Sequence, residues 1–411
     1  MKSVVPLRCV RNPCGKLLRR KATFPEVHSS KNIFHLFLAF LVYALQSGRA
    51  RAGDHVDYRF EHYKEENGRV QVDTHTVSFE TDLSKSIAAR GEMVYDGISG
   101  ATPYGAPPRP GSSQVPLAKL KDIRRAGNLG FDFHLGNHTL SPLVAYSKES
   151  DYESRSISLN DAIDFNEKNT TLRLGASHNF DKVLDFNSPR ANHNKDATDG
   201  LIGISQLINS KTIFTADFTY GHETGYLTDP YRQVLFQGWL TAIPGVPLYI
   251  VYPEVRPTER TKQVFQTTLT HFFEPMNGSA ELSYRFHHDS YGVFSHTVAM
   301  SWHQKLGDHV ILEPLFRYYE QSAANFYFPE GVPGLSPIDG DPTRSEHYSA
   351  DYRLSHFASL TYGLQASVVI KDKLFLDVGY HRYEMYGRDH VTSASAYPKA
   401  DIYTVGFRLW F

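Results

Sequence analysis

Hydrophobic and polar residues alternate with a period of two in most stretches of the chain from residue 55 onward. Because successive side chains of a strand point to opposite faces, this period predicts β-strands with one apolar and one polar surface. No helical spacing is sustained after residue 52. In one such stretch the alternating pairs are Ala280 and Glu281, Leu282 and Ser283, Tyr284 and Arg285, and Phe286 and His287.

Residues 403–411 repeat this pattern most clearly, because five apolar side chains fall on one face. The opposite face carries small or polar residues and Trp410. A terminal Phe that closes such a strand resembles the C-terminal signature of bacterial outer-membrane β-barrels, so Phe411 and Trp410 are the expected barrel-assembly signal. An ordinary half-buried edge strand is the alternative interpretation. The apolar face consists of Tyr403, Val405, Phe407, Leu409 and Phe411.

The alternation predicts a transmembrane antiparallel β-barrel of about sixteen strands, an even number that leaves both ends on the periplasmic side. Strand 151–160 has the weakest pattern, and since its loss would break the parity, fourteen strands is the alternative count. The expected strands are 55–63, 69–82, 86–96, 123–135, 138–148, 151–160, 168–180, 200–208, 212–222, 262–273, 278–289, 293–305, 309–320, 354–370, 373–386 and 400–411. Short turns alternate with long external loops, which are expected at 97–122, 181–199, 223–261, 320–353 and 387–399.

The first 52 residues have the composition of an export signal. A basic lead-in precedes the apolar run 33–45, which is too short to cross a bilayer comfortably, and Ala50-Arg51-Ala52 supplies small residues for cleavage. We therefore expect a signal peptide at 1–52, cleavage after Ala52, and a single outer-membrane barrel at 53–411 of a Gram-negative bacterium. Both cysteines lie in this leader, so the mature chain has no disulfide or thiolate site.

Removal of the leader leaves an acidic protein. The leader holds ten Lys or Arg and one acidic residue, so 33 basic and 43 acidic residues remain, a formal charge of −10. This balance argues against nucleic acid as a partner, whereas lipids and the barrel-assembly machinery are expected partners. The predicted lumen nevertheless carries both signs, and its residues either pair across water or select a solute. These lumen residues are Arg173, Asp217, Glu281, Arg285, Glu313, Arg317, Asp377 and Arg408.

One segment stands apart from the strand pattern. Asp96-Gly97-Ile98-Ser99-Gly100-Ala101-Thr102 resembles the Asp-x-x-(Ser/Thr)-Gly-Ala-(Thr/Ser) acceptor motif of proteins that carry covalent FMN. The resemblance implies that an FAD:protein FMN transferase esterifies the flavin phosphate to Thr102. The small Gly100 and Ala101 let the backbone enter a tight site, and Asp96 and Ser99 complete the motif. The alternative is a plain turn that Asp96 caps before the prolines at 107, 108 and 110.

The same segment with Tyr95 and Pro103, the stretch 150–154 and the terminal Phe411 together resemble a family of bacterial outer-membrane proteins defined by a domain of unknown function. This resemblance covers roughly the whole mature chain. It implies an FMN transferase and a small lipoprotein or redox protein as partners, without an established activity. No catalytic motif or metal-ligand spacing is recognisable, and the histidines are scattered.

We therefore expect an outer-membrane barrel that carries FMN on Thr102 and takes part in extracytoplasmic electron transfer as a redox carrier, not as an enzyme. A porin-like channel and a structural scaffold without cofactor are the alternatives. The strand count places Thr102 on an external loop, whereas the transferase works in the periplasm. The two agree if modification precedes barrel insertion, or if the strand count is wrong by one near the N-terminus.

Overall fold

The computed structural model describes residues 54–411 except for 110, 186–191, 240–246, 330–346 and 372. The expected signal peptide at 1–52 and its cleavage after Ala52 lie outside the described residues. Among the described residues, no helix is long and apolar enough to span a membrane.

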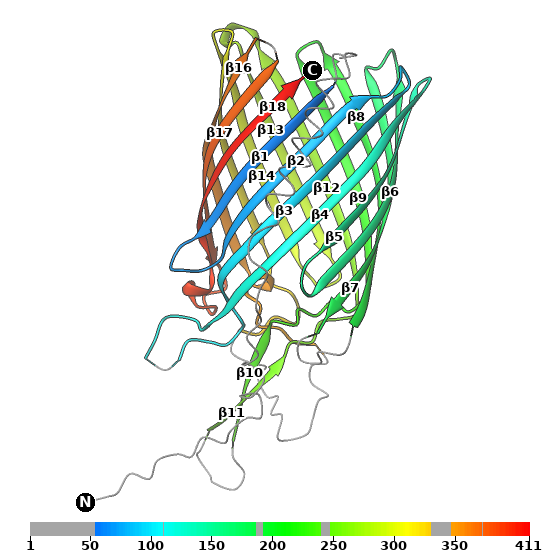
Figure 1. Cartoon of the computed structure of the whole chain (residues 1–411). Coiled ribbons are helices and arrows are strands. Elements are labelled where there is room, and N and C mark those ends of the chain that lie inside the picture. The colour runs from blue at the N-terminus through cyan, green and yellow to red at the C-terminus, as the bar shows by residue number, and fades with distance from the viewer. Residues whose placement is uncertain (1–53, 110, 186–191, 240–246, 330–346, 372) are drawn as a thin grey trace, which may run out of the picture. The chain divides into compact units, whose positions relative to one another are not determined.

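Sixteen antiparallel strands close into one barrel (Figure 1), which confirms the predicted fold class and strand number. Each strand pairs with its neighbour in sequence, except that β9 pairs with β12 and β1 pairs with β18. The barrel strands are β1 His55–Glu65, β2 Gln71–Asp82, β3 Ile87–Pro103, β4 Leu117–Leu135, β5 His138–Lys148, β6 Tyr152–Phe165, β7 Thr170–Leu184, β8 Asn192–Asn209, β9 Thr212–Gly225, β12 Glu259–Phe273, β13 Gly278–Asp289, β14 Phe294–Leu306, β15 Val310–Gln321, β16 Phe357–Ile370, β17 Leu374–Gly387 and β18 Lys399–Trp410.

The last strand closes the ring as the alternation predicts. β18 pairs with β1 from His55↔Trp410 to Glu65↔Ala400. Its apolar face points outward, where Val405 is 53 % exposed, whereas Arg408 points into the lumen and forms an ion pair with Asp57 at 2.6 Å.

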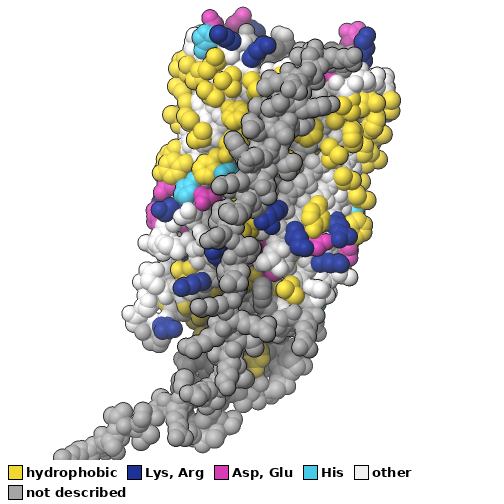
Figure 2. Space-filling model, viewed as in Figure 1, with side chains coloured by type: hydrophobic (Ala, Val, Ile, Leu, Met, Phe, Trp, Pro, Cys, Tyr) yellow, Lys and Arg dark blue, Asp and Glu magenta, His cyan; other side chains and the backbone are white. Residues whose placement is uncertain are grey.

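A hydrophobic belt surrounds part of the barrel wall. Figure 2 shows hydrophobic side chains gathered over the half of the visible wall nearer the C-terminus, with charged side chains at the rim and beyond the belt. Because only lipid stabilises such an exterior on a closed barrel, this is an outer-membrane β-barrel protein. The most exposed belt residues include Val144, Ile157, Ile202, Val378 and Val405.

The two ends of the barrel differ in their connections. Short turns join the strands at the end that holds the C-terminus, including the 3₁₀ turn η2 (Glu274–Met276). The other end carries the long connections, which include 104–116, 226–258, 322–356 and 388–398. These contain the 3₁₀ turns η4 (Tyr352–Leu354) and η5 (Ala394–Ala396), and a separate hairpin of β10 (Gln233–Trp239) and β11 (Pro247–Pro253) that the alternation did not predict.

The expected loop at 97–122 is wrong, because β3 continues to Pro103 and β4 begins at Leu117. The ladder is continuous there, with Gln71↔Ser99 on one side and Thr102↔Ala118 on the other. The expected loop at 181–199 is shorter for the same reason, since β7 runs to Leu184 and β8 begins at Asn192. Beyond the belt the outer face no longer needs apolar residues, so the alternation disappears while the backbone pairing persists.

Candidate functional site

The segment that resembles the FMN acceptor motif forms the end of β3 at the long-loop side of the wall. Asp96, Ile98, Gly100 and Thr102 lie on its lumen face, opposite the exposed Met93 of the belt. Gly97, Ser99 and Ala101 lie on the outer face beyond the belt. The motif is therefore part of the folded wall and not an open turn.

Two motif residues have clear structural roles. Asp96 is 5 % exposed and accepts hydrogen bonds from Thr74 Oγ1 at 2.7 Å and from Arg124 Nε at 2.5 Å, so it ties β3 to both neighbours and caps no turn. Gly100 has φ +115°, and a Cβ there would lie 2.2 Å from the carbonyl oxygen of Arg69. Only glycine fits this position without displacing the backbone.

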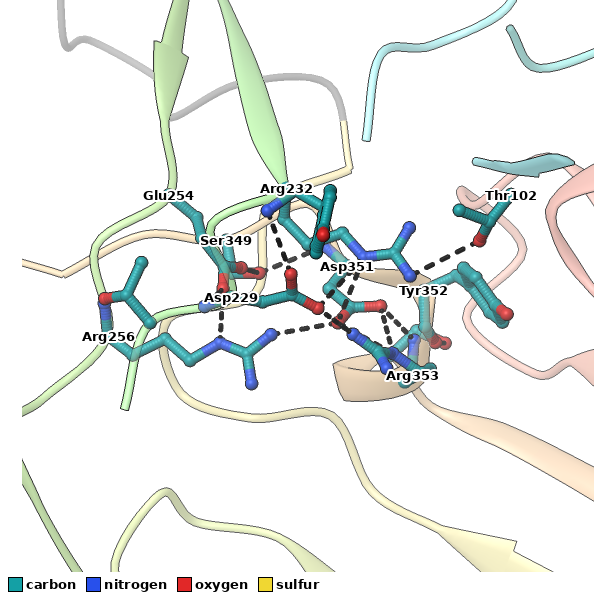
Figure 3. A network of polar contacts seen from close by, with 12 residues as sticks. Thr102, Asp229, Arg232, Glu254, Arg256, Ser349, Asp351, Tyr352 and Arg353 are labelled. Atoms are coloured by element: carbon teal, nitrogen blue, oxygen red, sulfur yellow. Dashed lines mark hydrogen bonds and ion pairs between the residues drawn. The ribbon is translucent and has the colours of Figure 1, made fainter. Parts of the chain in front are cut away.

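Thr102 faces a buried arginine. The Nη2 of Arg232 lies 3.4 Å from the Oγ1 of Thr102, as Figure 3 shows. The backbone next to Thr102 also meets this loop, because Gln233 N donates to Tyr104 O at 2.7 Å. Thr102 thus lies where the end of β3 contacts the connection between β9 and β12.

We call the described residues of 104–116, 226–258, 322–356 and 388–398 the mouth cap. A largely buried polar network joins its segments (Figure 3). Asp351, 1 % exposed, forms ion pairs with Arg353 at 2.5 Å, Arg256 at 2.9 Å and Arg232 at 3.7 Å. Glu254, equally buried, pairs with Arg256 at 2.6 Å. The network is completed by Asp229, which pairs with Arg353 at 2.5 Å and Arg232 at 3.5 Å, and by Ser349, which donates to Glu254.

This network crosses the mouth of the barrel. Thr102 is the second-last residue of β3, Arg256 precedes β12 and Asp351 precedes β16. In the ring, β3 and β12 are seven strands apart one way and nine the other, so they lie nearly opposite each other, with β16 between them on the longer path. Contacts that join these three positions must pass over the lumen, so the described parts of the connections cross the long-loop end of the barrel.

The network has strong electrostatic consequences. Burial opposes ionisation of Asp351, but Arg353, Arg232 and Arg256 outweigh it and hold the pKa of this carboxyl well below its ordinary value. Burial raises the pKa of Glu254, and Arg256 only partly offsets the rise. Asp351 therefore stays charged in the cap, whereas Glu254 is protonated more easily than an ordinary glutamate.

The model of the family "Protein of unknown function (DUF3570)" matches residues 39–399. The chain belongs to this family. The match spans the whole mouth cap, the motif on β3 and nearly all of the barrel wall. No curated protein matches the chain.

Solved structures similar to this DUF3570 member are barrels of very low identity. The siderophore receptor PirA from Pseudomonas aeruginosa is 10 % identical with a TM-score of 0.43, over 87 % of this chain and 62 % of that one. CdiB from Acinetobacter baumannii is 7 % identical with a TM-score of 0.49, over 88 % and 61 %. OmpT from Vibrio cholerae, with one loop deleted, is 7 % identical with a TM-score of 0.42, over 87 % and 98 %. The chain spans less than two thirds of PirA and CdiB.

The lumen residues expected from the sequence separate into paired and unpaired groups in the DUF3570 barrel. Arg173 forms an ion pair with Asp217 at 2.5 Å and donates to Ser205. Glu313 lies 3.4 Å from His303, and Glu281 accepts from Thr270 at 3.5 Å. Asp377 is buried.

Arg285 and Arg317 differ from these paired residues. Both have exposed side chains, and neither has a hydrogen bond or ion pair within the part of the chain that the structure describes.

Sequence reasoning missed the residues that surround Thr102. Arg232, Asp351 and Tyr352 lie in the expected loops 223–261 and 320–353, where no motif or period marks them. Their only sequence signal is composition, because charged and aromatic residues are frequent on both sides of 240–246 and after 346.

Proposed function

We propose that this outer-membrane barrel carries FMN esterified to Thr102 at its capped mouth and takes part in extracytoplasmic electron transfer. The supporting observation is the position of Thr102. Thr102 is the last residue of the acceptor-like segment and lies on the lumen side of the wall. Its hydroxyl contacts the guanidinium of the buried Arg232. A phosphodiester on Oγ1 would place its negative charge beside that cation.

The residues present fit such a group. Arg232 is 5 % exposed, and its Nε forms ion pairs with Asp229 at 3.5 Å and with Asp351 at 3.7 Å. Its Nη1 has no hydrogen-bond acceptor among the described residues, so one buried donor is left for a further acceptor such as a phosphate oxygen. FMN supplies reversible electron transfer at its isoalloxazine ring. The chain itself supplies the hydroxyl of Thr102, the neighbouring cation of Arg232 and the mouth cap beside them.

The attachment chemistry needs only the hydroxyl from this chain. Thr102 Oγ1 forms a bond to the phosphorus of the FMN half of FAD, while the pyrophosphate bond breaks and AMP leaves. The hydroxyl proton passes to a base on the transferase, whose magnesium stabilises the phosphate charge. The barrel is then a redox carrier, with no turnover site of its own.

The side of the membrane on which Thr102 lies determines whether flavin attachment comes before or after insertion of the barrel. Long loops mark the external end of outer-membrane barrels, and Thr102 lies at that end under the mouth cap. A periplasmic transferase therefore meets Thr102 while the chain is unfolded, before insertion. Transferase and FAD added to the purified protein should modify urea-unfolded chains and leave the folded barrel unmodified.

The decisive measurement is the intact mass and in-gel flavin fluorescence of the mature protein co-expressed with an FMN transferase. We expect the mass of FMN less one water on the wild type and on Thr102→Ser. Thr102→Ala should show no gain, whereas Thr76→Ala, which removes another lumen-side threonine, should be modified normally. An unmodified wild type would reject the proposal.

A selective pore is the second candidate function. It is favoured by a cavity of about 660 Å³ at the lumen wall, lined by charges of both signs that include Arg173, Asp217, Lys262 and Arg285. Planar-bilayer conductance that is equal in the wild type and Thr102→Ala would support this function without the flavin.

A further inference from the structure

Arg285 on β13 is a lumen arginine whose neighbours across the ladder are neutral. It alternates with the exposed apolar residues Leu282 and Tyr284, so its side chain points into the lumen. In the register it faces Gln266 on β12 and Thr297 on β14. Its exposed side chain makes no hydrogen bond or ion pair with the described residues, which leaves the N–H donors of its guanidinium open to a ligand.

Arg285 also lines a cavity in the lumen wall. The cavity measures about 660 Å³, and sites for small molecules span roughly 300–1,000 Å³. The acidic side chains that line it each have a basic partner. These pairs are Asp217 with Arg173 at 2.5 Å, Asp161 with His138 at 2.8 Å and Asp199 with Lys262 at 4.0 Å. Within the part of the chain that the structure describes, Arg285 is therefore the charged lining residue left without a partner.

A second arginine without a partner lies near this cavity. Arg317 on β15 faces Ala299 on β14 and Thr361 on β16, and its exposed side chain forms no hydrogen bond or ion pair with the described residues. β14 lies between β13 and β15, so Arg285 and Arg317 belong to strands that are two strand spacings, roughly 10 Å, apart. Two like charges on one stretch of wall attract anions and repel cations.

The cavity has an apolar part next to Arg285. Leu201 and Val264 line it, and both face Thr219 on β9. Val264 also faces His287, which is the next lumen-side residue after Arg285 on β13. An inorganic oxyanion has no group that could contact these side chains, whereas a short hydrocarbon chain would bury apolar surface against them. The lining therefore suits a small organic anion.

We propose that Arg285 binds the carboxylate of a small organic anion in this cavity, and that Arg317 adds to the local attraction for negative charge. A guanidinium offers a carboxylate two parallel N–H donors. The acidic residues of the lining are already paired, so they leave no counterpart for the ammonium group of a cation or an amino acid. The transport role of this site rests on the selective pore named above as the second candidate function, to which it gives a solute class, whereas binding itself needs neither a pore nor a flavin.

The test is isothermal titration calorimetry on the full chain, purified in detergent without an FMN transferase. Succinate is the carboxylate probe, succinamide is its neutral counterpart of the same length, and inorganic phosphate is an anion without a carbon chain. We expect succinate to bind at least about tenfold more tightly than succinamide, because hydrogen bonds between charged partners contribute at least that factor. Phosphate should bind more weakly than succinate.

Arg285→Gln should lower the affinity for succinate to the succinamide level, and Arg317→Gln should lower it by a smaller factor. The matched control is Arg59→Gln, because Arg59 is also an exposed arginine but lines a different cavity of the lumen wall. This control should leave succinate binding unchanged. All three side chains are exposed, so each variant should keep the heat-modifiable gel migration of the folded barrel.

Equal affinity for succinate and succinamide, or no binding of either, would overturn the site. A preference for succinate that survives in Arg285→Gln, or that falls as far in Arg59→Gln, would overturn it as well, because charge elsewhere in the lumen would then account for it. Phosphate that binds as tightly as succinate would overturn the organic carboxylate as the ligand.

Planar-bilayer conductance separates the failure of the site from the failure of the pore. Succinate binding without conductance would keep the site and reject the pore. Conductance that succinate does not alter, together with no calorimetric signal, would keep the pore and reject the site.

Discussion

The barrel wall and the mouth cap both contain pairs of arginine and aspartate, but the pairs differ in how far they are exposed to water. In the wall, the side chains of Arg173 and Asp217 are 33 % and 26 % exposed to the lumen. In the cap, those of Arg256 and Asp351 are 14 % and 1 % exposed. A wet pair is screened and replaceable, whereas each charge in a dry network depends on the others. Exposed pairs of the wall such as Arg173 and Asp217 should therefore tolerate change, whereas the buried network of the cap should not.

Asp351→Asn should have the largest effect of the changes considered, and this effect should be confined to the cap. It leaves three guanidiniums around a neutral amide, which should cost the cap about 3–5 kcal/mol. Hydrogen exchange of the cap amides should accelerate, while the heat-modifiable gel migration of the folded barrel persists. Unchanged exchange in the cap would show that the network does not hold it closed.

We expect the mouth cap to become more stable as the pH falls below neutral, and to open when the pH falls further. The raised pKa of Glu254 means that the folded cap gains protons as pH falls from neutral, which adds stability. The lowered pKa of Asp351 means that its contribution is present above about pH 4 and is lost as pH falls further.

Cap protection measured by hydrogen exchange should therefore pass through a maximum at mildly acidic pH. Glu254→Gln should remove the rising limb of this profile, and Asp351→Asn should remove the falling limb. A monotonic profile in the wild type would contradict the opposed shifts.

A smaller effect is expected where the wall meets the cap. Gly100→Ala introduces a Cβ at φ +115° against the carbonyl of Arg69, and should destabilise the end of β3 by roughly 1–3 kcal/mol. Gly97→Ala is its matched control, because a Cβ there lies 3.9 Å from Asp73 O. Urea unfolding followed by gel migration compares the two variants, and equal midpoints would mean that the backbone of Arg69 and Val70 relaxes around residue 100.

The wall itself should respond least. Asp217→Asn removes one partner of a half-wet pair, so we expect a loss of about 0–1 kcal/mol. The same urea assay measures it. A loss comparable with that of Asp351→Asn would erase the distinction between the wet wall and the dry cap.

The sequence predicts the strands well inside the hydrophobic belt and poorly beyond it. Within the belt, lipid outside and water inside impose a period of two, and strands such as β13 and β18 were predicted almost to the residue. Beyond the belt both faces are wet, so the sequence from Gly97 to Ala101 lost the pattern although its ladder continues. The extensions of β3, β4 and β8 were missed for this reason.

The site was predictable only in its local part. Asp96 and Thr102 stand out because their motif is contiguous in the chain. Arg232 and Asp351 act through contacts between residues more than a hundred positions apart, which no local period records. The flavin on Thr102 stays a prediction, and so do the partners expected for it.

The pairing of β1 with β18 fixes when the barrel can be completed. The first strand has no permanent partner on one side until the last strand arrives, so its backbone groups stay open throughout the intervening synthesis and export. Closure requires the most distant contact in the ring, which is slow to form. An unclosed chain with open edges is prone to aggregation, so a holding factor must shield β1 until β18 is in place.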